Sequence, residues 1–220
     1  MSSDVFRTGV HSLDRALGGG VPSGSVAVAL GDATSAVELL GYRTAVATER
    51  DTRYLTTMRT PATVRAAIDD AASAGRTLGD LGPSHSETVD IRQVGATETA
   101  GGFQPALDAF DTVVVDSFRD IVVTGGWREL FADIRSHVRE RDGLALFVLD
   151  ADPDKSLERP LRQVCRAADA VFEYRTDRAT EDTLTARKVR GLAAEEPVLP
   201  VTVSLEVGRT LYHDPDRGHE

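Results

Sequence analysis

Apolar residues follow two different periodicities along the first 175 residues of the chain. Short runs of small and β-branched apolar residues predict buried strands at 25–30, 53–57, 88–94, 112–116, 144–149 and 170–174. Between them, apolar residues recur at helical spacing and predict helices at 37–48, 61–74, 103–110, 127–141 and 156–168. This alternation is typical of an α/β fold with a mostly parallel central sheet flanked by helices on both faces.

The two ends of the chain depart from this alternation. Residues 8–20 predict a short helix in which the Ser12 hydroxyl caps the first turn and three glycines follow the last one. Residues 183–189, 201–207 and 210–212 predict antiparallel strands joined by turns. Because no linker-like stretch divides the 220 residues, we expect a single domain. The last ~8 residues are expected to form a flexible tail.

The surface is expected to be acidic and almost free of lysine. Aspartate and glutamate number 35 against 25 lysine and arginine residues, and the only lysines are Lys155 and Lys188. This composition resembles that of proteins from salt-accumulating halophilic archaea, in which a dense carboxylate surface stays hydrated. The net charge of −10 disfavours binding to nucleic acid, which depends on clustered lysine and arginine.

The remaining composition excludes or disfavours several other kinds of site. The single cysteine, Cys165, excludes an internal disulfide and a multi-cysteine zinc site. The five histidines do not have the spacing of metal ligands. The amino terminus has no signal-peptide pattern, and no apolar run approaches the ~20 residues of a membrane span. We therefore expect a soluble, cytoplasmic protein without a membrane partner.

The turn between the strand at 25–30 and the next helix occupies the place of a phosphate-binding loop. It consists of Gly31, Asp32, Ala33, Thr34, Ser35, Ala36, Val37 and Glu38. Aligned with the pattern G-x-x-x-x-G-K-[ST], it keeps the first glycine at Gly31. Ala36 replaces the second glycine, Val37 the phosphate-binding lysine, and Glu38 the hydroxyl residue that holds Mg²⁺. The turn therefore predicts a degenerate nucleotide site.

Four segments, in the same order, resemble the KaiC-like branch of the RecA-superfamily ATPases, including halophile proteins described as RecA-type ATPases implicated in signal transduction. The most specific segment is the opening at residues 8–25, with the pattern TGxxxLDxxLGGGxPxGS. The others are the turn at Gly31, the aspartate-ended strand at 113–117, and the sequence KVRG at 188–191. The resemblance spans nearly the whole chain and implies a RecA-like P-loop NTPase core.

The resemblance also implies roles for residues outside the turn. Asp116 and Ser117 match the end of the strand that organises Mg²⁺, although an aspartate there can also cap a loop or a helix. Lys188 and Arg190 match the pair that reaches toward the nucleotide of a neighbouring subunit, with salt bridges within or between subunits as the alternative. Met58 occupies the place of the catalytic glutamate, and a thioether cannot act as a base.

These observations favour a pseudo-ATPase without catalytic residues and without a cofactor, acting through protein–protein interaction in signalling or transcriptional control. Its partners would be other proteins or paralogous KaiC-like subunits, and the resemblance also allows a homo-oligomer. The first alternative is an active or weak ATPase that binds ATP and Mg²⁺, with Asp116 as a metal ligand, Lys188 functional and Glu38 recruited to the metal. The second is a recombinase-like accessory protein acting on DNA, for which residues 119–128 leave little room for DNA-binding loops.

Overall fold

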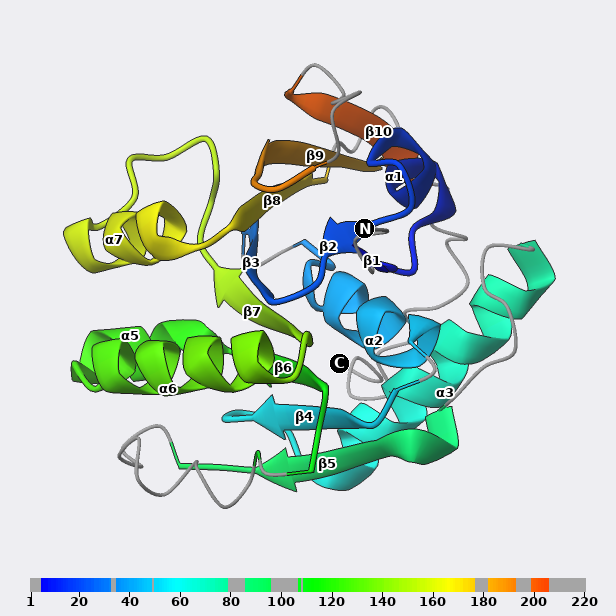
Figure 1. Cartoon of the computed structure of the whole chain (residues 1–220), viewed down its shortest axis with the longest axis horizontal. Helices are drawn as coiled ribbons and strands as arrows, with labels where there is room; N and C mark the ends of the chain where they lie inside the picture. The colour runs from blue at the N-terminus through cyan, green and yellow to red at the C-terminus, as the bar shows by residue number, and fades with distance from the viewer. Residues whose placement is uncertain are drawn as a thin grey trace, which may run out of the picture.

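The computed structural model describes residues 5–32, 35–48, 50–78, 86–95, 107, 109–176, 182–192 and 199–205. Eight strands form one sheet (Figure 1). Their spatial order is β10 (Val201–Leu205), β9 (Asp182–Val189), β8 (Ala170–Arg175), β3 (Ser25–Gly31), β7 (Leu144–Asp150), β6 (Thr112–Asp116), β4 (Thr52–Thr56) and β5 (Val89–Gln93). The six strands from β8 to β5 are parallel, whereas β9 and β10 are antiparallel at one side. The α/β class, the mostly parallel sheet and the antiparallel strands near the carboxyl end are thus confirmed.

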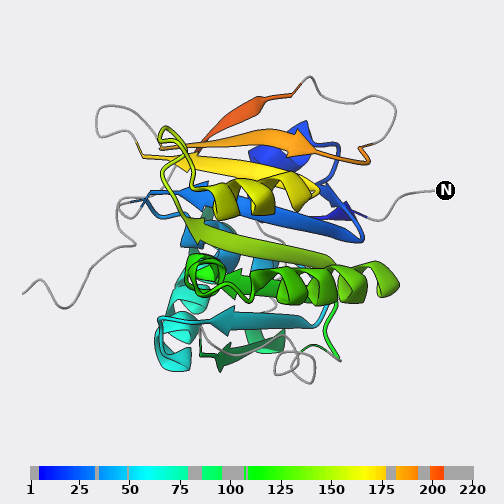
Figure 2. The ribbon, with the colours of Figure 1, turned by 90° about the vertical axis from the view of Figure 1, so that its left-hand side faces the viewer.

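Helices cover both faces of this sheet (Figures 1 and 2). One face carries α1 (His11–Ala16), α2 (Glu38–Ala47) and α3 (Pro61–Leu78), and the other carries α5 (Phe118–Thr124), α6 (Trp127–Glu140) and α7 (Arg159–Ala167). Along β3, Ala27 and Ala29 pack into the first apolar core, while Val26 and Val28 pack into the second. Central parallel strands are buried on both faces in this way, which explains their continuous apolar runs.

The amino-terminal segment contains a small additional sheet. β1 (Val5–Phe6) and β2 (Val21–Pro22) pair antiparallel, and strands of two residues are too short to produce a detectable sequence period. The predicted capping role of Ser12 is wrong. α1 begins at His11, so Ser12 lies inside the helix, and no side chain caps the helix at its amino end. Instead, the backbone N–H and the hydroxyl of Thr8 donate to Asp14 Oδ1 at 2.8 and 2.7 Å.

Several other boundaries differ from the predictions. α7 begins at residue 159 rather than 156, with a proline in its first turn, and α3 extends beyond 74 to 78. Residues 119–126, for which no element was predicted, contain most of α5, and α6 begins at residue 127 as predicted. The predicted strand at 210–212, the predicted tail and most of the predicted helix at 103–110 lie outside the described residues.

The residues singled out by the sequence lie at two opposite edges of the sheet. The carboxyl edge is where β3, β7, β6 and β4 end, and its register pairs Gly31 with Asp150 and Thr56 with Asp116. The amino edge is where these strands begin, and there the backbone N–H of Asp169 donates to the Val26 carbonyl at 2.7 Å. None of the helices in the described ranges has the length and apolar character needed to cross a membrane.

Candidate functional site

The turn after β3 closes tightly over the end of the strand. The hydroxyl and the backbone N–H of Ser35 both donate to the Asp32 carbonyl, at 2.7 and 2.9 Å. A Cβ atom placed on Gly31 would collide with the Ser35 hydroxyl and lie 2.6 Å from the Cβ of Val37. These two side chains therefore fill the space next to Gly31. Ala33 and Thr34 lie outside the described residues.

The start of α2 presents no cation to this turn. Val37 is 4% exposed and belongs to the apolar core, and the partly buried Ala36 packs against the same core. A lysine in the place of Val37 would have to hold its charge among apolar side chains, which is costly. Glu38 is the first residue of α2, where its carboxylate interacts favourably with the helix dipole.

Arg59 joins the two halves of the predicted site. It follows β4, and its Nη2 lies 2.8 Å from Glu38 Oε1 while its Nη1 lies 3.3 Å from Asp116 Oδ2. The same Nη1 donates to the hydroxyl of Tyr42. One guanidinium group therefore binds a carboxylate from α2, a carboxylate from β6 and a phenol from α2. Met58, the residue in the place of the catalytic glutamate, is 70% exposed.

Burial and charge shift the pKa values of this cluster in opposite directions. Burial raises the pKa of Asp116, Arg59 opposes this change, and Glu38 adds to it. Burial lowers the pKa of Arg59, but Asp116, Tyr42 and Glu38 raise it by more, so the guanidinium group stays charged. With both carboxylates ionised, two negative charges share one positive charge.

Ser117 contributes mainly its backbone to this edge. It follows Asp116 with φ 59° and ψ 44°, a left-handed conformation that turns the chain from β6 into α5. Its carbonyl lies 3.3 Å from the Thr57 hydroxyl, which is also 3.1 Å from Asp120 Oδ2. Its side chain does not cap α5. The structure thus brings Ser117 beside Asp116, as predicted, in a turn held by Thr57.

An open hollow of about 280 Å³ lies beside the Gly31 turn, between α5 and the loop after β7. Its charged lining residues are Asp32, Arg119, Asp150, Asp152, Lys155 and Glu158. Arg119 donates to the Asp150 carbonyl at 2.8 Å and pairs with Glu158 at 3.2 Å. Lys155 pairs with Asp152 at 3.0 Å. Four carboxylates thus line the hollow with two cations, and this balance disfavours a phosphate group.

The residues of the carboxyl edge do not fit ATP and Mg²⁺ bound in the manner of a P-loop. Ser35 and Val37 fill the space beside Gly31, and Arg59 is bound by Glu38 and Asp116. In the described part of the chain, no three Asp, Glu, His or Cys side chains are arranged to hold a metal ion.

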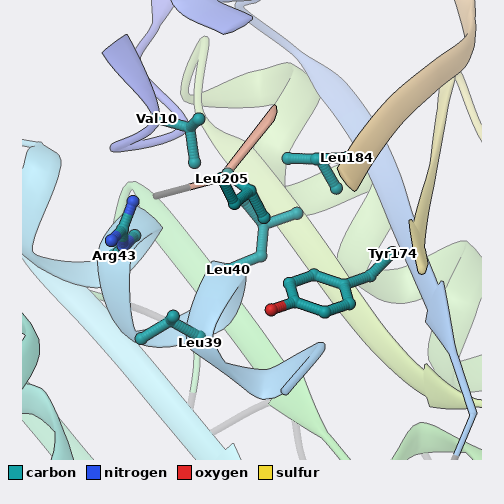
Figure 3. A pocket seen from close by; sticks show the side chains of 7 residues that line it. All are labelled: Val10, Leu39, Leu40, Arg43, Tyr174, Leu184 and Leu205. Carbon is teal, nitrogen blue, oxygen red and sulfur yellow. The ribbon is translucent and has the colours of Figure 1, made fainter. Parts of the chain in front are cut away.

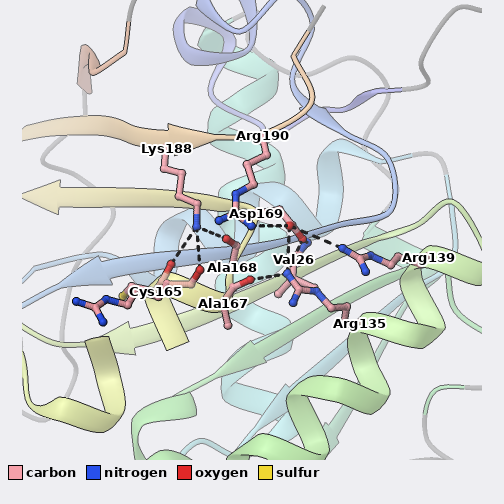
Figure 4. Close-up of polar contacts among 10 residues, drawn as sticks. Val26, Arg135, Arg139, Cys165, Ala167, Ala168, Asp169, Lys188 and Arg190 are labelled. Atoms are coloured by element: carbon pink, nitrogen blue, oxygen red, sulfur yellow. Dashed lines mark hydrogen bonds and ion pairs between the residues drawn. The ribbon is translucent and has the colours of Figure 1, made fainter. Parts of the chain in front are cut away.

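Lys188 and Arg190 lie at the amino edge, across the sheet from this turn (Figure 4). Lys188 Nζ donates to the carbonyl oxygens of Cys165, at 3.3 Å, Arg166, at 3.2 Å, and Ala168, all at the end of α7. Arg190 Nη1 lies 3.8 Å from Asp169 Oδ1. Arg190 therefore makes an ion pair within the chain, which is the alternative to a subunit-bridging role, whereas Lys188 is held by backbone carbonyls instead of the expected salt bridge.

A separate apolar pocket lies between α2 and the strands β8 to β10 (Figure 3). It is lined by Val10, Leu39, Leu40, Arg43, Tyr174, Leu184 and Leu205. Its volume of about 10 Å³ is enough for about one water molecule. This pocket is therefore a packing gap in the first core and is too small for a nucleotide base.

Arg59 is the important residue that the sequence analysis missed. Its signal was present, because Arg59 follows the end of β4 and β4 pairs with the aspartate-ended β6. Strand ends that are neighbours in a parallel sheet bring their following residues to one edge. Recognising this required the strand order, which the sequence pattern did not provide.

Comparison with known families gives one match. A family described as "Family of unknown function (DUF7125)" matches residues 5–212. Because the match spans nearly the whole chain, the protein belongs to this family. No curated protein matches the sequence.

Proposed function

We propose that this DUF7125 member is a KaiC-like regulatory protein with a RecA-like core and a degenerate nucleotide site. In this proposal it neither hydrolyses ATP nor holds it tightly, and it acts by binding other proteins in signalling or transcriptional control. The observation that carries the proposal is Arg59, which is bound by Glu38 and Asp116 at the place where phosphates would lie.

The energetic argument follows from what a triphosphate would have to displace. To bind phosphate, Arg59 would have to leave Glu38 and Asp116, whose side chains are 13% and 4% exposed. Either carboxylate would then repel the ligand by about 4 kcal/mol at ~4 Å with an effective dielectric constant of ~20. At about 1.4 kcal/mol per tenfold change, one such contact weakens binding on the order of a thousandfold.

The backbone supports the proposal in two ways. The Gly31 turn lies at the carboxyl end of a central strand, which is where open α/β sheets bind ligands, and this position supports a scaffold derived from a nucleotide site. The Ser35 and Val37 side chains occupy the space beside Gly31, so the specific cradle for phosphate is lost. Together these features favour a retained scaffold with a new use over a working ATPase.

Titration calorimetry with ATP and Mg²⁺ in molar KCl tests the nucleotide part of the proposal. We expect no measurable binding and no phosphate release. If the protein does bind ATP and turn it over, Asp116→Asn separates a genuine site from contamination, with Asp120→Asn as a control on the neighbouring helix. Turnover that disappears only with Asp116→Asn contradicts the proposal and favours the ATPase alternative.

Capture of partners at native salt concentration tests the regulatory part. A tagged protein should retain one or a few proteins reproducibly, with or without added ATP. Retention that requires ATP would contradict a nucleotide-independent scaffold. Retention of DNA that weakens steeply with salt would instead support the recombinase-like alternative.

A further inference from the structure

We propose that the amino edge of the sheet carries a docking surface for an acidic segment of a partner protein, centred on Arg139 and Arg190. This inference rests on the proposed function, since it names the chemistry of the partner that such a regulator would bind. The surface lies at the amino edge (Figure 4), whereas the Gly31 turn lies at the carboxyl edge, so the surface can be tested independently of nucleotide binding.

The charge balance of this surface is the reverse of that of the protein as a whole. Asp169 Oδ1 lies 3.1 Å from Arg135 Nη2, 3.9 Å from Arg139 Nη2 and 3.8 Å from Arg190 Nη1. With the nearby Lys188, four cations surround Asp169, in a chain whose net charge is −10. The other carboxylate facing this group among the described residues of α6 is Glu140.

The arginines differ in how firmly the protein holds them. Arg135 is fixed, because it also donates to the Ala167 carbonyl and lies over the Phe131 ring at 5.3 Å. Within the described part of the chain, the guanidinium groups of Arg139 and Arg190 contact Asp169 only at 3.9 and 3.8 Å, and these side chains are 58% and 60% exposed. Their guanidinium groups can therefore pair with incoming carboxylates in the bidentate geometry that arginine favours.

The adjoining surface is an open, elongated stretch along one helix rather than an enclosed ion site. An open hollow of about 400 Å³ follows one face of α6 and is lined by Ala132, Arg135, Ser136, Arg139 and Glu140. These residues span about two helical turns, or roughly 12 Å, which is the length of several extended residues. A peptide segment fits this shape better than a single small anion does.

Fluorescence anisotropy with a labelled glutamate-rich peptide tests the proposal. The wild-type protein should bind the peptide at about 0.2 M KCl and should bind it more weakly in molar KCl, because exposed charges are screened. The double substitution Arg139→Gln and Arg190→Gln should weaken binding by about tenfold or more. Arg92→Gln with Arg128→Gln removes the same charge from exposed arginines elsewhere and should change affinity by less than about twofold.

Four results would overturn the proposal. The wild-type protein could fail to bind the peptide, or both double variants could lose affinity equally, which would indicate a net-charge effect. Inorganic phosphate could displace the peptide at low concentration, which would indicate a site for a compact oxyanion. The Arg139 and Arg190 substitutions could change the sedimentation of the protein without changing peptide binding, which would indicate contact with a second copy of the chain.

The same variants separate this inference from the proposed function. Calorimetry with ATP on the Arg139→Gln, Arg190→Gln protein reports on the carboxyl edge, which these substitutions do not touch. ATP binding by both proteins together with loss of peptide binding would refute the pseudo-ATPase proposal and leave the docking surface supported. Absence of both ATP and peptide binding in the wild-type protein would refute the docking surface alone.

Discussion

The two edges of the sheet use the same ionic chemistry with the signs exchanged. At the carboxyl edge, one cation, Arg59, is shared by the carboxylates of Glu38 and Asp116. At the amino edge, three arginines share one carboxylate, that of Asp169. Arg135 lies closest to it, and Arg139 and Arg190 lie at longer distances. The first cluster has an excess of negative charge and the second an excess of positive charge. We therefore expect the carboxyl edge to repel polyanions and the amino edge to attract acidic ligands.

The comparison also shows which residue of each cluster matters most for stability. A shared ion neutralises several partners, so its removal leaves those partners close together with like charge and without compensation. Removing a peripheral partner leaves the remaining charges better balanced. The central residues, Asp169 and Arg59, should therefore be much more sensitive to substitution than the residues around them.

Asp169→Ala should have the largest effect on stability. Besides its arginine partners, this carboxylate accepts a hydrogen bond from the Val26 backbone N–H at 3.1 Å. Removing it leaves a buried donor unsatisfied and three guanidinium groups without a shared counter-ion, which should cost about 4 kcal/mol. Chemical denaturation of both proteins measures the difference.

A more exposed pair provides the matched control for this substitution. Asp111 pairs with Arg141 at 2.9 Å, and their side chains are 25% and 39% exposed. Asp111→Ala should cost less than about 1 kcal/mol, as solvent-exposed ion pairs usually do. Equal losses for Asp169→Ala and Asp111→Ala would show that Asp169 does not have a central role.

Arg59→Ala should have the next largest effect, about 3 kcal/mol, because it leaves Glu38 and Asp116 without their shared cation. The estimate lies at the low end for a broken buried pair, since the Arg59 side chain is 30% exposed. Adding Glu38→Gln to Arg59→Ala should recover part of the loss by removing one of the two unpaired charges. Urea denaturation of the two variants tests this, and a further loss in the double variant would contradict the shared-cation interpretation.

Asp14 shows what happens to a buried carboxylate for which burial outweighs the nearby positive charge of Arg7. Burial raises its pKa to about 6 from 3.8, although hydrogen bonds from Thr8 and Gly9 oppose the change. The folded protein thus holds a proton that the unfolded chain releases between about pH 4 and pH 6. The stability linked to this proton is present below pH 4 and is lost as pH rises through about 6, by up to about 3 kcal/mol.

Asp14→Asn removes this titration and keeps an acceptor oxygen for Thr8. The free energy of unfolding of the variant, relative to wild type, should therefore increase by about 2 kcal/mol between about pH 4 and pH 7. Denaturation at several pH values measures this difference. A difference that is independent of pH would show that Asp14 titrates normally in the folded protein.

The sequence predicted the fold better than it predicted the site, for a physical reason. Strands such as 112–116 and 144–149 are buried on both faces, so local apolar runs are enough to predict them. The bounds of these strands in the structure agree with the predicted bounds within about one residue. α5 was missed because its seven residues are too few to establish a helical period. The two strands of the small amino-terminal sheet were missed for the same reason.

The chemistry of the site depends on strand order, which local patterns do not contain. The turn residues and Asp116 were predicted because each has a motif, but Arg59 has none and becomes part of the site only when β4 lies beside β6. Likewise, Arg135 and Arg139 of α6 meet Asp169, which lies between α7 and β8, at the amino edge. Ionic clusters of this kind depend on the tertiary arrangement, so they are hard to predict from a single sequence.

Lys188→Met should give the smallest effect, a loss of about 1 kcal/mol. The lysine donates to carbonyl oxygens at the end of α7, where a cation also interacts favourably with the helix dipole. Lys155, the other lysine, has a side chain that is 81% exposed, and among the described residues its ion pair is with Asp152, three residues away. Lys155→Met removes the same charge and should leave the denaturation midpoint unchanged. Methionine keeps most of the aliphatic length of lysine, so a difference in midpoint between the two variants isolates the contacts of Lys188 with α7. Equal midpoints would mean that these contacts add nothing to stability.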